Sequence, residues 1–175
     1  MNPIRAHVII SAPREKVYEL ISDLSARPAW CGHYQRDYHL TRPRPSGEGA
    51  GARFMVKTPF ARTWVELVIV EANAPGLLRE QLRLSRLGRT PGYAEYELVP
   101  LGRNTRVELM LWTEPATRVD AFKESIGGRR SLGRQVRKSL KRLRTILEEQ
   151  GEKPLERAAI AGYEPAKAPR FGSTA

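Results

Sequence analysis

The stretch SAPREKVYELISDLSARPAW, Ser11 to Trp30, decides how the fold begins. It follows the β-branched run Ile4–Ile10, which is typical of a strand. Pro13 ends that strand, because proline has no N–H for a sheet ladder and is tolerated in the first turn of a helix. Apolar residues then recur at helical spacing as far as Leu24, so the sequence predicts a short amphipathic helix directly after the strand.

A second short helix is predicted at the end of the same stretch. The pattern of the first helix fades at Ser22 and Asp23, and Ser25 can cap a new helix that Pro28 interrupts or begins. Trp30 is then left to pack on the core.

From Tyr34 onward the apolar period becomes two, with turn residues at intervals. GEGAG, between two of these runs, reads as a flexible hairpin, since it lacks the helix and lysine of a phosphate-binding loop. The spacing predicts an antiparallel meander, which together with Ile4–Ile10 makes seven strands. The six strands that we expect are Tyr34–Thr41, Ala52–Lys57, Thr63–Ala72, Leu77–Ser85, Tyr93–Val99 and Thr105–Thr113.

The chain turns helical after Pro115, and a long amphipathic helix is predicted over Ser131–Gln150, with Gly127-Gly128 bending or breaking the helix before it. Its apolar stripe would lie on the dry face of the sheet. That stripe consists of Leu132, Val136, Leu140, Leu143 and Leu147. The opposite, solvated face is basic and carries Arg130, Arg134, Arg137, Lys138, Lys141 and Arg144.

The composition indicates an ordinary globular domain with a strong positive charge. The 175 residues include 30 Lys and Arg against 19 Asp and Glu, a formal net charge of +11. We expect one domain over residues 1–150 and a flexible tail over 151–175, which is rich in Ala, Pro and Gly. Cys31 is the only cysteine, so an intramolecular disulfide is excluded. We expect a cytoplasmic protein without a metal or other cofactor.

The opening stretch, from Ala12-Pro13 through Asp23 to Pro28 and Trp30, resembles the start of the START-like (SRPBCC) superfamily, especially its polyketide cyclase/dehydrase and lipid-transport members. The order of elements extends the resemblance from Ile4 to Gln150. It implies a helix-grip fold of the α+β class, in which a curved seven-stranded antiparallel sheet wraps around the long C-terminal helix. It also implies a cavity between sheet and helix that takes small hydrophobic molecules.

A closed core and a hollow one would use the same inward residues, so periodicity does not separate them. With the resemblance we expect a ligand cavity, and a carrier or binder of a lipid or an aromatic, polyketide-like molecule. The expected lining residues are Trp30, Phe54, Leu67, Leu82, Tyr96, Leu109, Val136 and Leu140.

Two polar residues fall among these apolar positions. Glu80 is in phase with Leu78 and Leu82, and a carboxylate on a dry face must be paired or hydrogen-bonded. We expect it to orient a ligand; alternatively, it lies near a strand end and reaches water. Arg129 precedes Leu132 by about one helical turn and could pair with Glu80 or with an acidic ligand.

No catalytic constellation organises the polar residues. His33 is expected near the cavity mouth, or at the surface as an ordinary or capping histidine, and Cys31 is expected to be a small buried filler. The main alternative to a carrier is a cyclase or aromatase in which Tyr38, Tyr96, Glu80 or Arg129 assists proton transfer.

A third alternative uses the basic helix face. Arg134, Arg137, Lys138 and Lys141 could contact nucleic acid or an anionic membrane. The other interpretation is that these cations only solvate the helix, and the sequence leaves the choice open.

Overall fold

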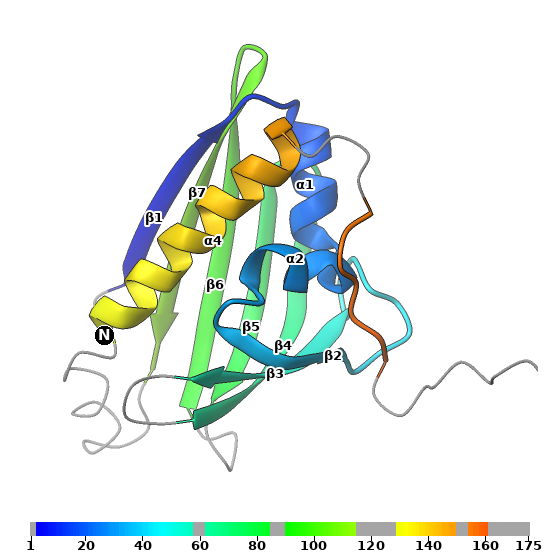
Figure 1. Ribbon diagram of the computed structural model, residues 1–175, viewed down its shortest axis with the longest axis vertical. Helices are drawn as coiled ribbons and strands as arrows, with labels where there is room; N and C mark the ends of the chain where they lie inside the picture. Colours follow the sequence, from blue (N-terminus) through cyan, green and yellow to red (C-terminus); the bar gives the residue numbers. More distant parts are fainter. Residues whose placement is uncertain (1–2, 58–61, 85–89, 115–128, 150–153, 161–175) are drawn as a thin grey trace, which may run out of the picture.

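A seven-stranded antiparallel sheet forms the body of the protein (Figure 1). The computed structural model describes residues 3–57, 62–84, 90–114, 129–149 and 154–160. The strand order is β1-β7-β6-β5-β4-β3-β2. β2 to β7 therefore form a meander, and β1 pairs with β7 at its edge. The strands are β1 (Ile4–Ile10), β2 (Gln35–Leu40), β3 (Gly51–Lys57), β4 (Arg62–Asn73), β5 (Leu77–Leu84), β6 (Thr90–Leu101) and β7 (Asn104–Thr113).

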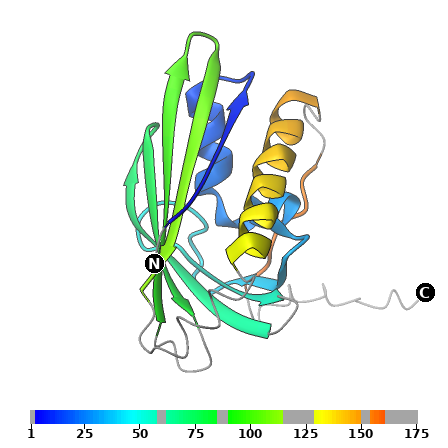
Figure 2. The same cartoon turned by 90° about the vertical axis from the view of Figure 1, so that its left-hand side faces the viewer.

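The described helices cover one face of this sheet. Figure 2 shows the longest of them, α4, on the same side of the sheet as α1. α4 packs against β1 and α2, whereas α1 covers β6 and β7. The helices are α1 (Arg14–Ser22), the 3-10 helix η1 (Leu24–Ala26), α2 (Arg27–Cys31) and α4 (Arg129–Glu149). This arrangement confirms the predicted helix-grip fold of the α+β class. Within the described residues, no helix combines the length and the apolar character needed to cross a membrane.

The alternation of the strands sorts their side chains between a dry and a wet face, as predicted. The face toward the helices buries Phe54, Leu67, Leu82 and Leu109. The opposite face exposes charged side chains, among them Arg53, Glu66 and Arg83. We call these the inner and the outer face of the sheet.

The helix pair before β2 follows the predicted order, with a different cap. α1 begins directly after Pro13. The side chain of Asp23, rather than that of Ser25, caps η1: its Oδ1 accepts hydrogen bonds from the Ser25 N–H at 2.9 Å and from the Ser25 hydroxyl at 2.6 Å. Asp and Ser are both favoured at this position, and the turn places the carboxylate where it reaches the free N–H. Pro28 lies in the first turn of α2.

The ends of the predicted elements shift by at most three residues. β6 starts at Thr90 rather than Tyr93, and α4 starts at Arg129 rather than Ser131. GEGAG joins two paired strands, β2 and β3, and its Gly47 and Gly49 have φ values of 80° and 81°, which glycine adopts without strain. Ser85, the segment after Pro115 and the Gly127-Gly128 bend lie outside the described residues.

Residues 154–160, expected as part of a flexible tail, lie against the domain. The Ala158 N–H donates to the Ser25 carbonyl at 2.7 Å, and the Leu40 N–H donates to the Ala159 carbonyl at 2.9 Å. Arg157 forms an ion pair with Asp23 at 2.9 Å. This segment therefore closes over η1 and the edge of β2, an outcome that its Ala- and Pro-rich composition did not indicate.

The interior between sheet and helices differs between its two ends. At the end covered by α1, Leu78 and Val107 on the inner face and Val17 on α1 itself have no exposed surface. At the other end, Leu84 on β5 and Leu132 on α4 are only half-buried. We refer to these as the fully buried end and the half-buried end.

Candidate functional site

One arginine of the described residues enters the protein interior between the two ends. Arg27 is the first residue of α2, and only 1% of its side chain is exposed. The turn capped by Asp23 directs it inward, where its Nη2 donates to the Ile21 carbonyl at 3.1 Å. The helix pair therefore fixes the guanidinium at one position.

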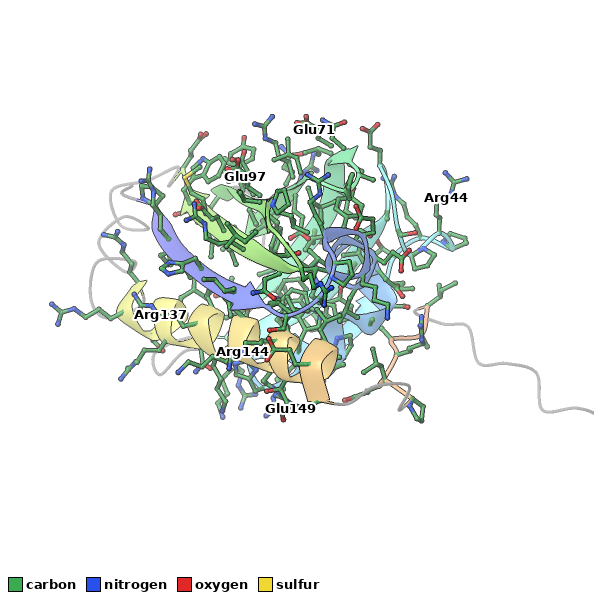
Figure 3. All side chains as sticks on the ribbon, turned by 90° about the horizontal axis from the view of Figure 1, so that it is seen from above. Arg44, Glu71, Glu97, Arg137, Arg144 and Glu149 are labelled. Carbon is green, nitrogen blue, oxygen red and sulfur yellow. The ribbon has the colours of Figure 1, made fainter. Side chains whose placement is uncertain are left out.

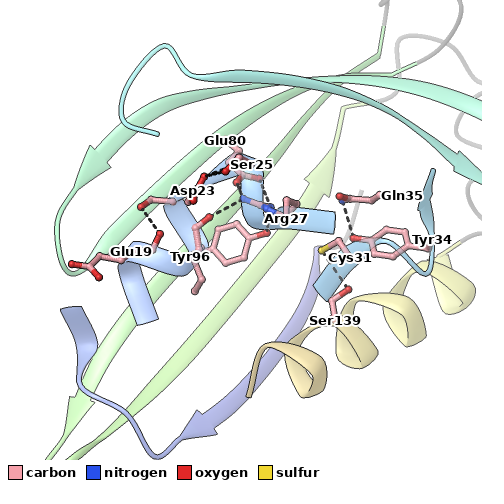
Figure 4. A network of polar contacts seen from close by, with 12 residues as sticks. Glu19, Asp23, Ser25, Arg27, Cys31, Tyr34, Gln35, Glu80, Tyr96 and Ser139 are labelled. Carbon is pink, nitrogen blue, oxygen red and sulfur yellow. Dashed lines mark hydrogen bonds and ion pairs between the residues drawn. The ribbon is translucent and has the colours of Figure 1, made fainter. Parts of the chain in front are cut away.

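Arg27 forms a buried ion pair with Glu80 on the inner face of β5 (Figure 4). Its Nη2 lies 2.5 Å from Oε1 of Glu80 and its Nη1 lies 3.5 Å from Oε2, so both nitrogens face the carboxylate. Burial is the largest single influence and would lower the pKa of the guanidinium, but the Glu80 carboxylate together with Tyr96, Tyr38 and Cys31 more than offsets it, so the pKa is raised well above its ordinary value. Arg27 is therefore charged at every physiological pH.

Aromatic rings enclose the ion pair. The Arg27 Nη1 donates to the Tyr96 hydroxyl oxygen at 3.0 Å, and its guanidinium carbon lies 4.7 Å from the centre of the Trp30 ring. The rings of Trp30 and Tyr96 meet edge to face, with centres 6.5 Å apart. Such cation–π contacts strengthen when water is excluded, so the rings stabilise the buried charge.

Several donors beside the pair have no acceptor among the described residues. These are the Trp30 Nε1–H and the Tyr38 hydroxyl, together with the Arg27 Nε–H. Burial raises the pKa of the Tyr38 and Tyr96 hydroxyls, so both keep their protons. Because the Tyr96 oxygen already accepts from Arg27, its own O–H is available to donate. The site therefore offers hydrogen-bond donors in an otherwise apolar interior.

A second polar chain lies beside the ion pair, toward α4. The Cys31 thiol donates to the Ser139 hydroxyl on α4 at 3.6 Å, and the Gln35 amide donates to the Tyr34 hydroxyl at 3.2 Å. Burial raises the pKa of the Cys31 thiol to about 11. At neutral pH the thiol is protonated and buried, which fits a filler and argues against a nucleophile.

The structure shows where the two polar candidates of the inner face lie, while a role of Glu80 in orienting a ligand stays a prediction. Glu80 is 2% exposed, so it points inward as expected and does not reach water. Arg129 is not its partner: Arg129 is half-buried at the start of α4, and its Nη2 donates to the Pro3 carbonyl at 3.1 Å. The prediction that Arg129 pairs with Glu80 is therefore wrong, because the start of α4 places Arg129 beside the N-terminal strand.

The expected apolar lining residues are all buried around the same interior. Their exposed fractions lie between 1% and 8%, and their role in binding a ligand stays a prediction. They are Trp30, Phe54, Leu67, Leu82, Tyr96, Leu109, Val136 and Leu140.

A cleft of about 450 Å³ lies outside this interior, between α2, β2, α4 and residues 154–160. His33 lines it, and burial together with the nearby Arg142 and Lys138 lowers the pKa of that imidazole. His33 therefore lies at a cleft on the surface, formed in part by a segment for which the sequence predicted no fixed position.

Sequence reasoning missed Arg27. The available signal was a lone arginine between Ala26 and Pro28, just ahead of Trp30, in a stretch expected to face the core. A cation among buried neighbours requires an anion, and Glu80 was the unpaired anion on the inner face.

Residues 1–148 match the model of the family described as polyketide cyclase / dehydrase and lipid transport. The match covers nearly all of the residues that form the sheet and helices. Among curated proteins, none matches the chain.

Solved structures share the fold at low sequence identity. The KanY protein (ms6282) aligns with a TM-score of 0.67 and 20% identity, over 83% of this chain and 97% of that one. TTHA0849 from Thermus thermophilus aligns with a TM-score of 0.64 and 19% identity, over 83% and 96%. DynU16, a protein in the dynemicin biosynthetic locus, aligns with a TM-score of 0.57 and 15% identity, over 86% of this chain and 48% of that one.

Proposed function

Because the chain belongs to the polyketide cyclase / dehydrase and lipid transport family, we propose that it binds a small, largely apolar molecule that carries an oxygen acceptor. The molecule lies between the sheet and α4, with its oxygen toward Arg27 and Tyr96. One observation carries the proposal: donors that have no acceptor in the described part of the chain cluster beside a buried ion pair.

The chemistry of the ligand follows from these donors. A buried donor without an acceptor costs about 1–3 kcal/mol, which a carbonyl, phenol or carboxylate oxygen of the ligand would recover. The remaining surface around the site is apolar and would contribute roughly 0.8 kcal/mol for each methylene that it covers. After the cost of association, micromolar affinity is the expected range.

A matched pair of probes tests this proposal. Fluorenone and fluorene differ by one carbonyl oxygen, and we expect fluorenone to bind about ten-fold more tightly, the equivalent of one neutral hydrogen bond. The variants Tyr38→Phe and Trp30→Phe each remove a free donor while keeping an aromatic ring. We expect one of them to abolish the preference for fluorenone, as measured by isothermal titration calorimetry.

A control variant and the native ligand complete the test. Tyr93→Phe removes a hydroxyl from the outer face and should leave the preference unchanged. Native mass spectrometry of the protein from its own host should show a retained oxygen-bearing apolar molecule. Equal affinities for the two probes, or binding of neither, would contradict the proposal.

The cyclase alternative needs a group that transfers protons, and the described residues offer little for it. Cys31 and Tyr96 hold their protons at neutral pH, and the Glu80 carboxylate is engaged by Arg27. These features favour binding over catalysis. Loss of turnover in Glu80→Gln with binding of the substrate retained would favour the cyclase instead.

The basic face of α4 supports a second candidate function, docking on an anionic surface. Arg134, Arg137, Lys138 and Lys141 are all exposed, and among the described residues none of the four has an ion-pair partner. A lipid carrier would gain from such a face near anionic lipid. We expect binding to vesicles with one-third phosphatidylserine that weakens with salt and is lost in Arg137→Glu/Lys138→Glu; binding unchanged by both would exclude this face.

A further inference from the structure

The outer face of the sheet carries more aromatic surface than a solvated face requires. Two of the three tryptophans, Trp64 and Trp112, lie there, both half-buried. Trp112 stacks on Tyr93 with ring centres 5.3 Å apart, and the Arg53 guanidinium lies 4.8 Å from the centre of the Trp64 ring. An antiparallel sheet with one face in water normally places polar residues there.

The register of the strands arranges this face in rows. One uncharged row crosses four neighbouring strands, with Trp112 on β7, Tyr93 on β6, Gln81 on β5 and Val68 on β4. We call it the aromatic row. Its four members are cross-strand neighbours and form a continuous strip without a charge.

A row that contains both signs of charge flanks the aromatic row on each side. On one side, β5, β4 and β3 present Arg83, Glu66 and Arg53 in register. On the other side, Arg79 on β5 forms ion pairs at 2.6 Å with both Glu95 and Glu71. The face therefore has an uncharged centre and a rim of mixed charge.

We propose that this outer face is the interface between two copies of the protein, which associate sheet to sheet about a two-fold axis. An uncharged aromatic centre with a polar rim is the usual anatomy of such interfaces, and Trp, Tyr and Arg are the residues that dominate their energetics. Stacked sheets pack about 10 Å apart, so side chains of the two aromatic rows would interdigitate.

The charge pattern selects a second copy as the partner. In a two-fold interface the same surface meets itself, so each charged row must face a row that holds the opposite sign. Both rows meet this condition when the axis runs parallel to the strands between β4 and β5, because Arg83 then faces Glu66 of the second copy and Arg79 faces Glu71 of the second copy. A polyanion would instead meet the carboxylates of Glu66 and Glu95.

The outer face of the sheet and the exposed face of α4 differ in the signs of charge that they carry. Figure 3 shows Glu71 and Glu97 on the sheet side, and Arg137 and Arg144 on the opposite, helix side. The exposed face of α4 is dominated by cations and would repel its own copy. Self-association therefore belongs to the sheet, and the interface is independent of the interior around Arg27.

Sedimentation velocity of the full chain tests the proposal. We expect a mass of twice 19.8 kDa for the wild-type protein at the upper end of a concentration series from about 1 µM to about 1 mM, with dissociation on dilution. Trp112→Glu places a charge in the aromatic row and should weaken the dimer at least about thirty-fold, the loss typical of a central aromatic residue.

Charge variants test the row pattern without altering the aromatic centre. Glu66→Arg turns its row entirely cationic and should also weaken the dimer, whereas Glu66→Arg/Arg83→Glu exchanges the two facing charges and should recover it. Ile9→Glu, on the same face of β1 and 47% exposed in the wild type, lies away from these rows and is the matched control. Circular dichroism and thermal unfolding confirm that each variant is folded.

Three results would overturn the proposal. The first is the mass of one chain across the whole concentration series. The second is a dimer that Trp112→Glu and Glu66→Arg leave intact, which would place the contact elsewhere. The third is binding of single-stranded DNA or anionic vesicles by a monomer that loses this binding in Trp112→Ala, which would assign the face to a polyanion.

Discussion

The two ends of the interior are built from the same strands and the same kinds of residue, yet they pack differently. On β5, Leu78 has no exposed surface, whereas Leu84, six residues along the same face, is half-buried. The difference follows from the helices. α1 begins directly after Pro13 and covers β6 and β7 at the fully buried end, whereas α4 starts at the half-buried end. Strand alternation therefore determines which face is dry, and helix placement determines how dry each end becomes.

Removal of the ion pair between these ends is expected to have the largest effect on stability. Arg27→Met leaves Glu80 as a buried carboxylate without its partner, and we expect a loss of about 3–5 kcal/mol in the free energy of unfolding. Urea denaturation followed by circular dichroism measures it. Arg27→Met/Glu80→Leu removes both charges and should recover most of that loss; a double variant as unstable as the single one would show that packing, rather than charge, is decisive.

Truncation of one leucine at each end sharpens the comparison directly. Leu78→Ala should lower the free energy of unfolding by about 3 kcal/mol, since the site is fully buried and would leave a cavity. Leu84→Ala, on the same strand and face, should cost about 1 kcal/mol, because water already reaches part of that side chain. Equal losses in urea denaturation would mean that the two ends are equally packed.

The pH dependence of stability probes the polar chain beside the ion pair. The folded-state pKa of Cys31 is raised to about 11, so its contribution is complete below the unfolded pKa of about 8.5 and is lost as pH rises toward 11. We expect the wild type to lose about 2–3 kcal/mol more than Cys31→Ala between these two pH values. Parallel profiles for the two proteins in urea denaturation would contradict the assignment.

The smallest effect is expected outside the interior. Arg157→Ala removes an ion pair in which the arginine is 63% exposed, and such pairs contribute at most about 1 kcal/mol. Asp23→Ala removes the same pair and also the cap of η1, so it should cost about 1 kcal/mol more. If both variants lose equal stability in thermal unfolding, the cap contributes nothing.

Much of the fold could be predicted because its signals are local. Pro13 after a β-branched run, the period of two from Tyr34 and the stripe from Val136 to Leu143 each follow from backbone chemistry and burial. The inward direction of Glu80 followed from the same alternation. The partner of Glu80 could not be predicted, because Arg27 lies 53 positions earlier in the chain and only the path of the chain brings the two together. The docking of residues 154–160 could not be predicted either. Two of its contacts are backbone hydrogen bonds, which carry no side-chain signal, and its ion pair joins Arg157 to Asp23, 134 positions earlier in the chain.

The position of Arg27 on α2 has a consequence for the kinetics of exchange. The guanidinium joins the helix pair to β5 and β6, so lifting α2 from the sheet would separate two charges in a low dielectric and cost several kcal/mol. A barrier of that size slows opening by orders of magnitude. A molecule in the interior would therefore enter and leave past Leu84 and Leu132, and its residence time would be set there.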